Sequence, residues 1–315
     1  MKRKVIKQGN NTLTITLPRK WTSEFKIKPG DEIDLKDAEN GLLLTTHYHE
    51  EPKSIDLNVD DMARLSLAKL LTACFEQGFD TIRLNFSKRT TESWSHGQEN
   101  VADVINFFVG RLVGFEVLSQ SPKCITIGNL SEKLTKFDNI LSRVFFLIEE
   151  YLQHLVGSIK SGSYSDLGTG ENMHDNITKL VALASRMVYE NSSLPRAEAL
   201  NYFAVLNYLD KITDHIRYAY RNTMSFKKKA GKETLELAEK AFRYLELYRH
   251  FFYKFSYNAI NELDVLRGEI KKMFIEASKK NRESSIAANF DAIAETLHGA
   301  IQPRIAVELS KGAKK

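Results

Sequence analysis

The stretch from residue 131 to residue 310 constrains the fold most, because its apolar side chains recur at helical spacing with few interruptions. The clearest stripe advances by three and four residues in turn, as the core face of a helical bundle does. It consists of Leu134, Phe137, Leu141, Val144, Ile148, Tyr151 and Leu155. Pro195 is the only proline of this stretch before Pro303, and it stands where a helix must begin. The pattern predicts an all-α region.

Breaks in the helical pattern divide this region into two sets of three helices. The breaks fall at residues 157–170, 191–195 and 227–231, which are rich in Gly, Ser, Asn or Lys. The predicted helices are 131–158, 171–190, 196–223, 232–256, 257–280 and 283–309. Because the two sets have similar lengths, we expect an internal repeat that forms a double three-helix bundle.

Residues 53–129 have the pattern of a small α/β segment. The predicted strands are 54–59, 81–86, 115–118 and 124–127, and the predicted helices are 60–77 and 100–113. We expect Asp60 or Asp61 to cap the first helix, and Gly78 and Gly114 to end the two helices. The polar residues 87–98 predict a loop. This order of elements favours a small sheet covered by two helices.

Residues 1–51 predict a module of short strands. Residues 12–17 alternate between Thr and apolar side chains, and Pro18 closes that strand. Trp21 and Phe25 lie four residues apart, so they would share a helical face. Turns are expected at 9–11, 28–31 and 40–41, with strands at 4–7, 33–35 and 42–46. A module this small buries little surface alone, which favours a dimer.

Positive charge is concentrated at the N-terminus. Residues 1–28 contain eight Lys and Arg side chains and one carboxylate, a net charge of +7, whereas the whole chain carries +5. A basic segment on a near-neutral remainder indicates a polyanionic partner, although a basic N-terminus also serves solubility.

Composition favours a cytoplasmic protein without membrane insertion. The sequence has no run of about 18 uncharged apolar residues, and MKRKVIKQG is followed by no apolar run of the kind a signal peptide needs. Cys74 and Cys124 lack metal-ligand spacing and fit a reducing compartment. With no phosphate-binding loop and no G-x-S-x-G motif, nothing indicates an enzyme.

Three short motifs occur in order within the first 51 residues. They are the Lys-x-Gly-Asn segment at 7–10, the strand end at 14–21 with its Pro-Arg-Lys-Trp, and the Lys-Pro-Gly-Asp-Glu turn at 28–32. Together they resemble the AbrB/MazE/SpoVT family of swapped-hairpin DNA-binding domains. The resemblance implies a homodimer in which two chains interleave hairpins into one small β-barrel that binds double-stranded DNA.

Carried onto this sequence, the resemblance implies a DNA-binding set in the first hairpin and the loop that follows it. The set comprises Lys4, Lys7, Asn10, Asn11, Thr14, Thr16, Arg19 and Lys20. Lys and Arg neutralise phosphates, while Asn and Thr hydrogen-bond to base edges or sugars. Alternatively, Thr14 and Thr16 only form the solvated face of a strand.

The two predicted three-helix sets resemble the PhoU family of phosphate-uptake regulators. The resemblance is carried by residues 206–216, Leu-Asn-Tyr-Leu-Asp-Lys-Ile-Thr-Asp-His-Ile, in which Asp210 and Asp214 lie one helical turn apart. In that family such pairs help to bind iron or zinc. Two further pairs share the spacing, Glu171 with Asp175 and Asp291 with Glu295. Ordinary surface acids on solvated helices would give the same pattern, and His215 would then be a capping or surface residue.

The combination resembles fusions of an AbrB domain with a PhoU domain, seen mainly in archaea. The fold class expected is therefore multidomain α+β: a dimeric swapped-hairpin barrel at 1–51, an α/β segment at 53–129 and a PhoU-like double bundle at 131–310. The resemblance implies a transcription regulator of phosphate-responsive genes. Two alternatives are an adaptor that binds a phosphate transporter or sensor kinase, and an antitoxin. His47 and His49 share a strand face and predict either a metal site or a polar strand end.

Overall fold

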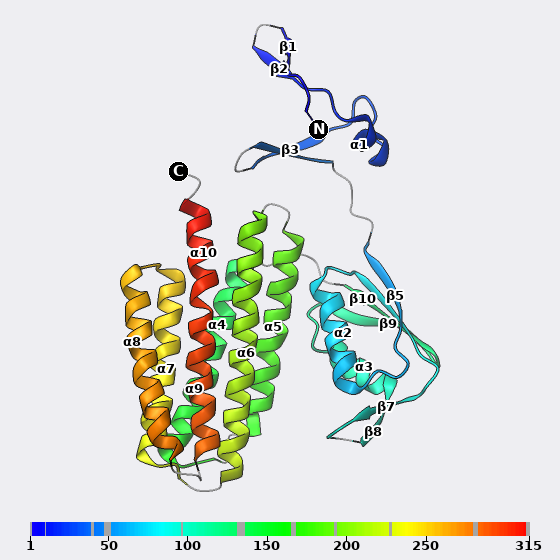
Figure 1. Cartoon of the computed structure of the whole chain (residues 1–315). Helices are drawn as coiled ribbons and strands as arrows, with labels where there is room; N and C mark the ends of the chain where they lie inside the picture. Colours follow the sequence, from blue (N-terminus) through cyan, green and yellow to red (C-terminus); the bar gives the residue numbers. More distant parts are fainter. Residues whose placement is uncertain are drawn as a thin grey trace. The chain divides into compact units, whose positions relative to one another are not determined.

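A computed structural model of the chain forms two compact units. It describes residues 2–9, 11–38, 41–46, 52–95, 97–130, 136–164, 168–191, 194–226, 229–279 and 283–312. The first unit is Met1–Glu51 and the second is Pro52–Lys315 (Figure 1). The predicted α/β segment and the predicted helical region thus lie together in the second unit.

The first unit consists of two β-hairpins and a short helix. Strands β1 (Ile6–Gln8) and β2 (Thr12–Thr14) pair antiparallel, and Gly9 between them has φ 70°, which favours glycine. Helix α1 (Arg19–Glu24) follows Pro18, and β3 (Ile33–Ala38) pairs antiparallel with β4 (Gly41–Thr46). The strand predicted over 12–17 is shorter than expected, since it ends at Thr14.

No closed barrel is present in the described part of this single chain. The two hairpins form separate two-stranded sheets, and no described residue of the first unit is buried. A lone two-stranded hairpin has no second layer to cover its apolar side chains. The swapped-hairpin barrel therefore stays a prediction that concerns two chains.

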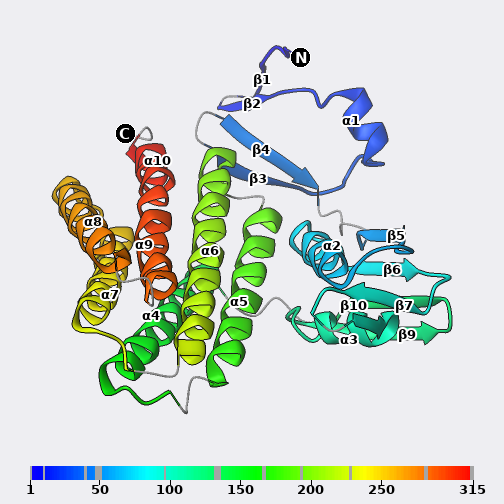
Figure 2. The same cartoon turned by 60° about the horizontal axis from the view of Figure 1, so that its bottom comes forward.

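The second unit begins with a four-stranded sheet covered by two helices. Its elements are β5 (Ser54–Asn58), α2 (Arg64–Glu76), β6 (Thr81–Asn85), α3 (Val101–Val109), β9 (Phe115–Ser121) and β10 (Cys124–Asn129). The strand order is β5-β6-β10-β9, with β5 parallel to β6 and the other pairs antiparallel (Figure 2). Leu71 and Phe75 of α2 pack in one core with Ile82, Leu84 and Ile125 of the sheet. The predicted strands and helices are confirmed, with shifted ends.

Two details of this sheet segment differ from the predictions. Residues 87–98 are not all loop, because they include β7 (Thr90–Ser93) and part of β8 (Gly97–Asn100), which pair antiparallel. Neither Asp60 nor Asp61 caps α2, whose N-cap is Ala63. The carboxylate of Asp60 instead accepts hydrogen bonds from the Ser87 and Lys88 backbone N–H groups, at 2.7 and 3.1 Å, which lower its pKa to about 2. This carboxylate therefore ties the start of α2 to the loop after β6.

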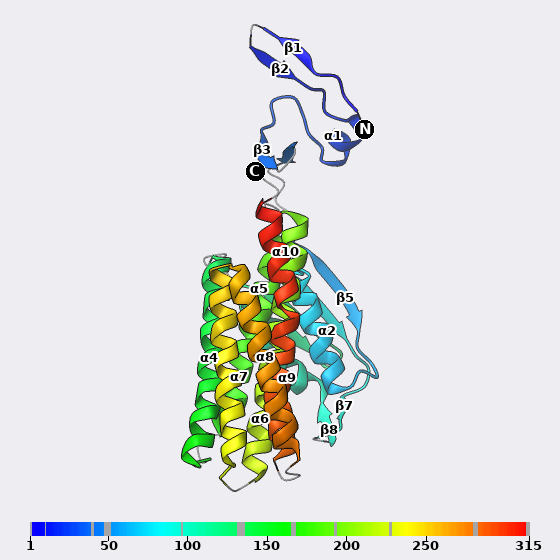
Figure 3. The same cartoon turned by 60° about the vertical axis from the view of Figure 1, so that its left-hand side comes forward.

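The remaining elements are helices that run nearly parallel and antiparallel to one another (Figure 3). They are α4 (Phe137–Ser161), α5 (Gly170–Glu190), α6 (Arg196–Phe226), α7 (Lys232–Tyr253), α8 (Tyr257–Ser278), α9 (Ser284–Gly299) and α10 (Ile301–Gly312). Residues of α4 to α9 share one hydrophobic core, in which α4 contacts α7 and α6 contacts α9. The predicted stripe lies in this core from Leu141 to Leu155, while Phe137 is partly buried and Leu134 lies outside the described residues.

The last predicted helix is two helices, because Pro303 breaks it. Proline clashes with the carbonyl four residues earlier, which here belongs to Gly299, the last residue of α9. Pro303 fits in the first turn of α10, where a backbone N–H needs no helical partner. Within the described parts of the chain, every helix is too short or too polar to span a lipid bilayer.

Helix α5 joins the sheet segment to the helical bundle. The guanidinium of Arg186, with only 5% of its side chain exposed, donates to the carbonyl oxygens of Phe75 and Phe79 at 3.0 and 2.8 Å and pairs with Asp80 at 2.9 Å. A buried cation that satisfies three partners across a joint fixes the two parts relative to each other. The second unit is therefore one body with two cores.

Candidate functional site

The cations predicted to contact DNA lie on the surface of the first unit. Lys4, Lys7, Arg19 and Lys20 are all exposed. No ion pair joins any of the four to a carboxylate among the described residues. Their charges are therefore available to a polyanion.

The hairpin divides the predicted set between its two faces. Lys7 stands opposite Leu13 in the register, whereas Thr14 stands opposite Ile6, so Lys7 and Thr14 point to different sides. The Thr14 hydroxyl donates to the Ile6 carbonyl oxygen at 3.3 Å. Asn11 and Thr16 are exposed, and Asn10 lies outside the described residues. One flat surface on this hairpin cannot present all of these residues to DNA.

Arg19 and Lys20 occupy the first two positions of α1. Pro18 precedes them with φ −64°, the value at which its ring is fixed, so the helix starts here. The rings of Trp21 and Phe25 then contact each other in a tilted arrangement, with centroids 5.7 Å apart, as their spacing predicts. Neighbouring helical residues point in different directions, so Arg19 and Lys20 would contact different phosphates.

The turn after α1 is set by a glycine and by a carboxylate that accepts a backbone hydrogen bond. Gly30 has φ 98°, a conformation that favours glycine, and the Lys28 backbone N–H donates to the Asp31 carboxylate at 2.7 Å. The turn predicted from Lys28 to Asp31 is confirmed.

Apolar side chains of the first unit face solvent in the single chain. They are Val5, Ile6, Leu13, Ile15, Leu35 and Leu42, and every one is more than half exposed, with Leu13 at 70% and Leu35 at 63%. Burying a side chain of this kind stabilises a protein by about 1.5–3 kcal/mol. Six such side chains in 51 residues, on both faces of the first hairpin, leave apolar surface of the kind that a partner covers.

On α5 and α6, the acidic residues predicted to bind metal surround a buried histidine. His174, 5% exposed, approaches the Asp175 carboxylate with Nδ1 at 3.0 Å and the Asp214 carboxylate with Nε2 at 3.3 Å. Burial opposes its charge, but these two carboxylates raise its pKa. Arg217 pairs with Asp214 at 2.6 Å, and Arg111 pairs with Asp175.

These contacts keep the two carboxylates charged. Burial alone would raise the pKa of Asp214, but the hydrogen bond to His174 and the charges of Arg217 and Lys211 outweigh it and lower the pKa to about 2. The pKa of Asp175 is lowered against its burial by His174 and Arg111. His215 is half-buried in the middle of α6, so it caps no helix.

The remaining predicted pairs are joined to cations. Glu171 accepts from Arg221 at 2.6 Å. On α9, Glu295 pairs with Arg267 at 2.9 Å, and Asp291 pairs with Lys271 at 2.9 Å. Arg267 lowers the pKa of Glu295. Both cations come from α8, so these pairs fasten α8 to α9.

The donors brought together here do not fit an iron or zinc site. Among the described residues, no group of three or more His, Cys, Asp and Glu side chains is placed to hold a metal ion. Five of the six predicted carboxylates already have a Lys or Arg partner, which a metal would have to displace. The metal sites predicted at the acidic pairs therefore stay a prediction without geometric support. The other candidate ligands, His47 and His49, lie outside the described residues.

Asp210 is the exception, because no ion pair joins it among the described residues. It lines a cavity of about 300 Å³ with Glu76 of α2, Lys179 and Ser185 of α5, and Arg111. Burial and the charge of Asp210 raise the pKa of Glu76 to about 7, and burial and the charge of Asp214 raise the pKa of Asp210. Glu76 and His174 were not predicted, because the carboxylates that face them across the packing, Asp210 and Asp214, come from another helix, α6.

Comparison with protein families found a match in the N-terminal part of the chain. Residues 6–54 match the family described as antidote-toxin recognition MazE, bacterial antitoxin. The search of curated proteins found no match to the chain. The likeness thus covers the two hairpins and α1, and supports a regulator of DNA-binding or antitoxin type.

Proposed function

We propose that the protein binds double-stranded DNA as a homodimer through residues 1–51 and regulates transcription. The observation that carries the proposal is that one small unit combines exposed cations with six exposed apolar side chains. The apolar side chains match a second copy of the unit, and the cations match the phosphate backbone. The match to the MazE family supports both halves of this assignment.

The proposed DNA binding requires the first units of both protomers. A dimer that uses three or four cations per chain contacts about 6–8 phosphates, and the release of counterions from those phosphates drives binding. Thr16 and Asn11, both exposed, can hydrogen-bond to bases or sugars, whereas Thr14 already bonds to its own hairpin. We assign no catalytic activity, because the sequence carries no catalytic motif.

A finer proposal concerns the helical part. We infer that residues 131–310 sense or transmit a phosphate-related signal, on the strength of their resemblance to PhoU and their two packed three-helix sets. Mapping bound DNA across the genome at high and low phosphate tests this. Sites that cluster at phosphate-uptake genes and change occupancy would support it, and sites indifferent to phosphate would contradict it.

Two alternative functions also involve a dimer but do not make the protein a transcription regulator that senses phosphate. As an adaptor, the protein would bind a transporter or sensor kinase and would have no operator. As an antitoxin, which the name of the matched family favours, it would neutralise a toxin encoded beside it. The regulator is preferred because a large compact unit, Pro52–Lys315, follows the first unit, whereas antitoxin tails are usually short and flexible.

The experiment compares duplex binding of Arg19→Ala/Lys20→Ala with that of Lys123→Ala/Lys272→Ala, a control that removes two exposed cations of the second unit. Four cations leave each dimer, so we expect the first variant to bind about 10- to 100-fold more weakly at physiological salt. The control should bind like the parent protein, and both should remain dimers. Equal retention of all three proteins in a gel-shift assay would refute the proposal.

A further inference from the structure

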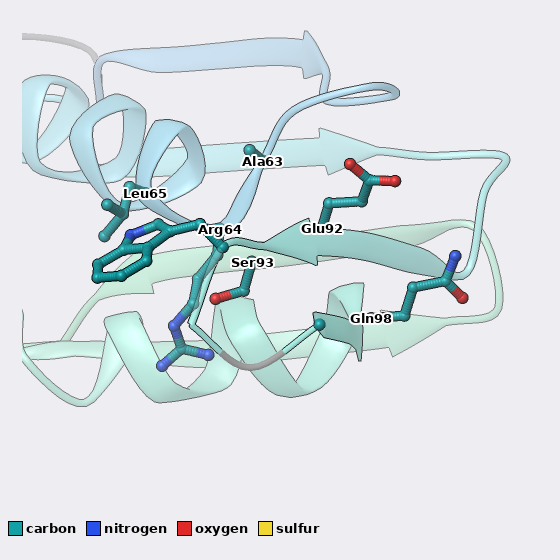
Figure 4. Close-up of a pocket in the computed structure, with 8 residues that line it drawn as sticks. Ala63, Arg64, Leu65, Glu92, Ser93 and Gln98 are labelled. Carbon is teal, nitrogen blue, oxygen red and sulfur yellow. The ribbon is translucent and has the colours of Figure 1, made fainter.

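A surface of the second unit exposes an aromatic side chain on a rigid support. Trp94, directly after β7, has the largest exposed fraction among the large apolar side chains of the described residues, 86%. It lines a groove of about 540 Å³ together with Arg64, Leu65 and Glu92 (Figure 4). Leu65 and Phe107 are also about half exposed, at 53% and 49%. Trp94, Leu65, Phe107, Glu92 and Arg64 are called the Trp94 surface below.

The support beneath this surface is well fixed. The Arg64 guanidinium lies 4.7 Å from the Phe107 ring centroid and pairs with Glu99 of β8 at 2.6 Å. The Thr91 hydroxyl of β7 donates to the Met62 carbonyl oxygen at 2.6 Å. Figure 4 shows Glu92 and Ser93 pointing to opposite sides of β7, in line with an exposed Glu92 and a buried Ser93. The hairpin that carries Trp94 is thus anchored to the segment before α2, to α2 itself and, through Arg64, to α3.

The charges on the Trp94 surface and directly beside it are complementary to those of a second copy. Arg64 is paired with Glu99, which leaves Glu92 as an exposed carboxylate of the groove. Lys69 is exposed one helical turn after Leu65, on the same side of α2. A two-fold contact is reciprocal, so each pair of residues that meet across it occurs twice. Lys69 of each copy can therefore approach Glu92 of the other copy.

The size of the surface also favours a second copy over a separate partner. An aromatic side chain buries about 150–250 Å², whereas a stable contact between free proteins buries about 1,200–2,000 Å² in total. Three apolar side chains therefore bury less area than a stable contact between free proteins needs. A weak contact can still form between two chains that are already linked, because the link raises the effective concentration of the second contact to about millimolar. The proposed dimer of residues 1–51 supplies such a link, since β5 starts at Ser54.

We infer that the Trp94 surface is a second dimer contact, in which the second units of two copies meet across a two-fold axis. This inference rests on the proposed dimer. The contact would explain why the β7–β8 hairpin is present. This hairpin is an insertion between β6 and α3 that forms its own two-stranded sheet and is not part of the four-stranded sheet. The contact would fix the spacing between two helical bundles on one DNA site.

Fluorescence of Trp94 tests the contact in the full chain. The sequence has two tryptophans, Trp21 and Trp94, so Trp21→Phe leaves Trp94 as the only reporter. In the dimer, we expect acrylamide to quench Trp94 at least about threefold less than in a Leu13→Asp monomer, because interface cores exclude water. Sedimentation of the same samples reports the oligomeric state.

A pair of variants measures the strength of the contact. Trp94→Ala should weaken dimerisation by about 10- to 30-fold, as loss of an aromatic hot spot does. Tyr257→Ala, which removes an aromatic side chain 69% exposed on α8, should leave it unchanged. A dimer in which Trp94 is quenched as in the monomer overturns this inference and leaves the DNA-binding proposal standing. A parent chain that stays monomeric overturns both.

Discussion

The first 51 residues and the rest of the chain use their apolar side chains in opposite ways. In the first unit every described apolar side chain is at least partly exposed, whereas the second unit buries two cores of aliphatic and aromatic residues. The second unit can therefore reach its fold as one chain, while the first needs a partner. The difference teaches that the proposed DNA-binding unit depends on assembly for its core, whereas the second unit builds its cores within one chain.

The largest effect should come from the helical core. Phe145 and Phe146 are adjacent in α4, but Phe145 is fully buried and Phe146 is 41% exposed. Phe145→Ala should lower the free energy of unfolding by about 3–5 kcal/mol, because it removes apolar contacts and leaves a cavity. Phe146→Ala is the matched control and should cost less than about 1 kcal/mol. Urea denaturation followed by circular dichroism measures both, and equal losses would refute the described packing of α4.

The next effect concerns assembly of the first unit. Leu13→Asp with Leu35→Asp places two charges where the second copy is expected, so dimerisation and duplex binding should both weaken by more than about 100-fold. The helical circular dichroism signal and the main unfolding transition should stay those of the parent. If the double variant dimerised normally, the apolar side chains of the first unit would not be its interface.

The smallest effect concerns Glu76. Its pKa is raised from 4.5 to about 7, so the folded protein favours the protonated form, and this stabilisation is present below about pH 4.5 and lost as the pH rises through 7. Glu76→Gln should therefore be more stable than the parent at pH 8, by about 1–2 kcal/mol after allowance for its partial exposure, and equal to it near pH 4. Thermal unfolding across this pH range tests the sign. A variant less stable at pH 8 would contradict the burial of that carboxylate.

Local patterns of the sequence predicted most of the fold. The stripe from Leu141 to Leu155, the helix start after Pro195, the turn at Gly30 and the helix end at Gly78 follow from spacing and backbone preference. All appear in the structure. The β7–β8 hairpin was missed, because its strands are polar and short. Asp60 was misassigned as a helix cap, because its hydrogen-bond partners lie 27 and 28 residues further along the chain.

The candidate site was less predictable, since it depends on contacts between distant segments. The acidic pairs were correctly placed on α5, α6 and α9, but the sequence alone did not reveal that Arg111, Arg217 and Arg267 would pair with them. Nor did it reveal that Lys7 and Thr14 point to opposite faces of one hairpin. Spacing predicts which residues share a helix face, whereas the partners across a core are set by the tertiary fold.

The affinity of the full-length protein for duplex DNA, measured against salt concentration, tests the central claim most directly. A dimer that neutralises about 6–8 phosphates should give a log-log slope of about −5 to −7. With Arg19→Ala/Lys20→Ala the slope should shrink by about 3–4, because four cations leave the dimer. A slope near zero, or binding by a monomer, would contradict the account.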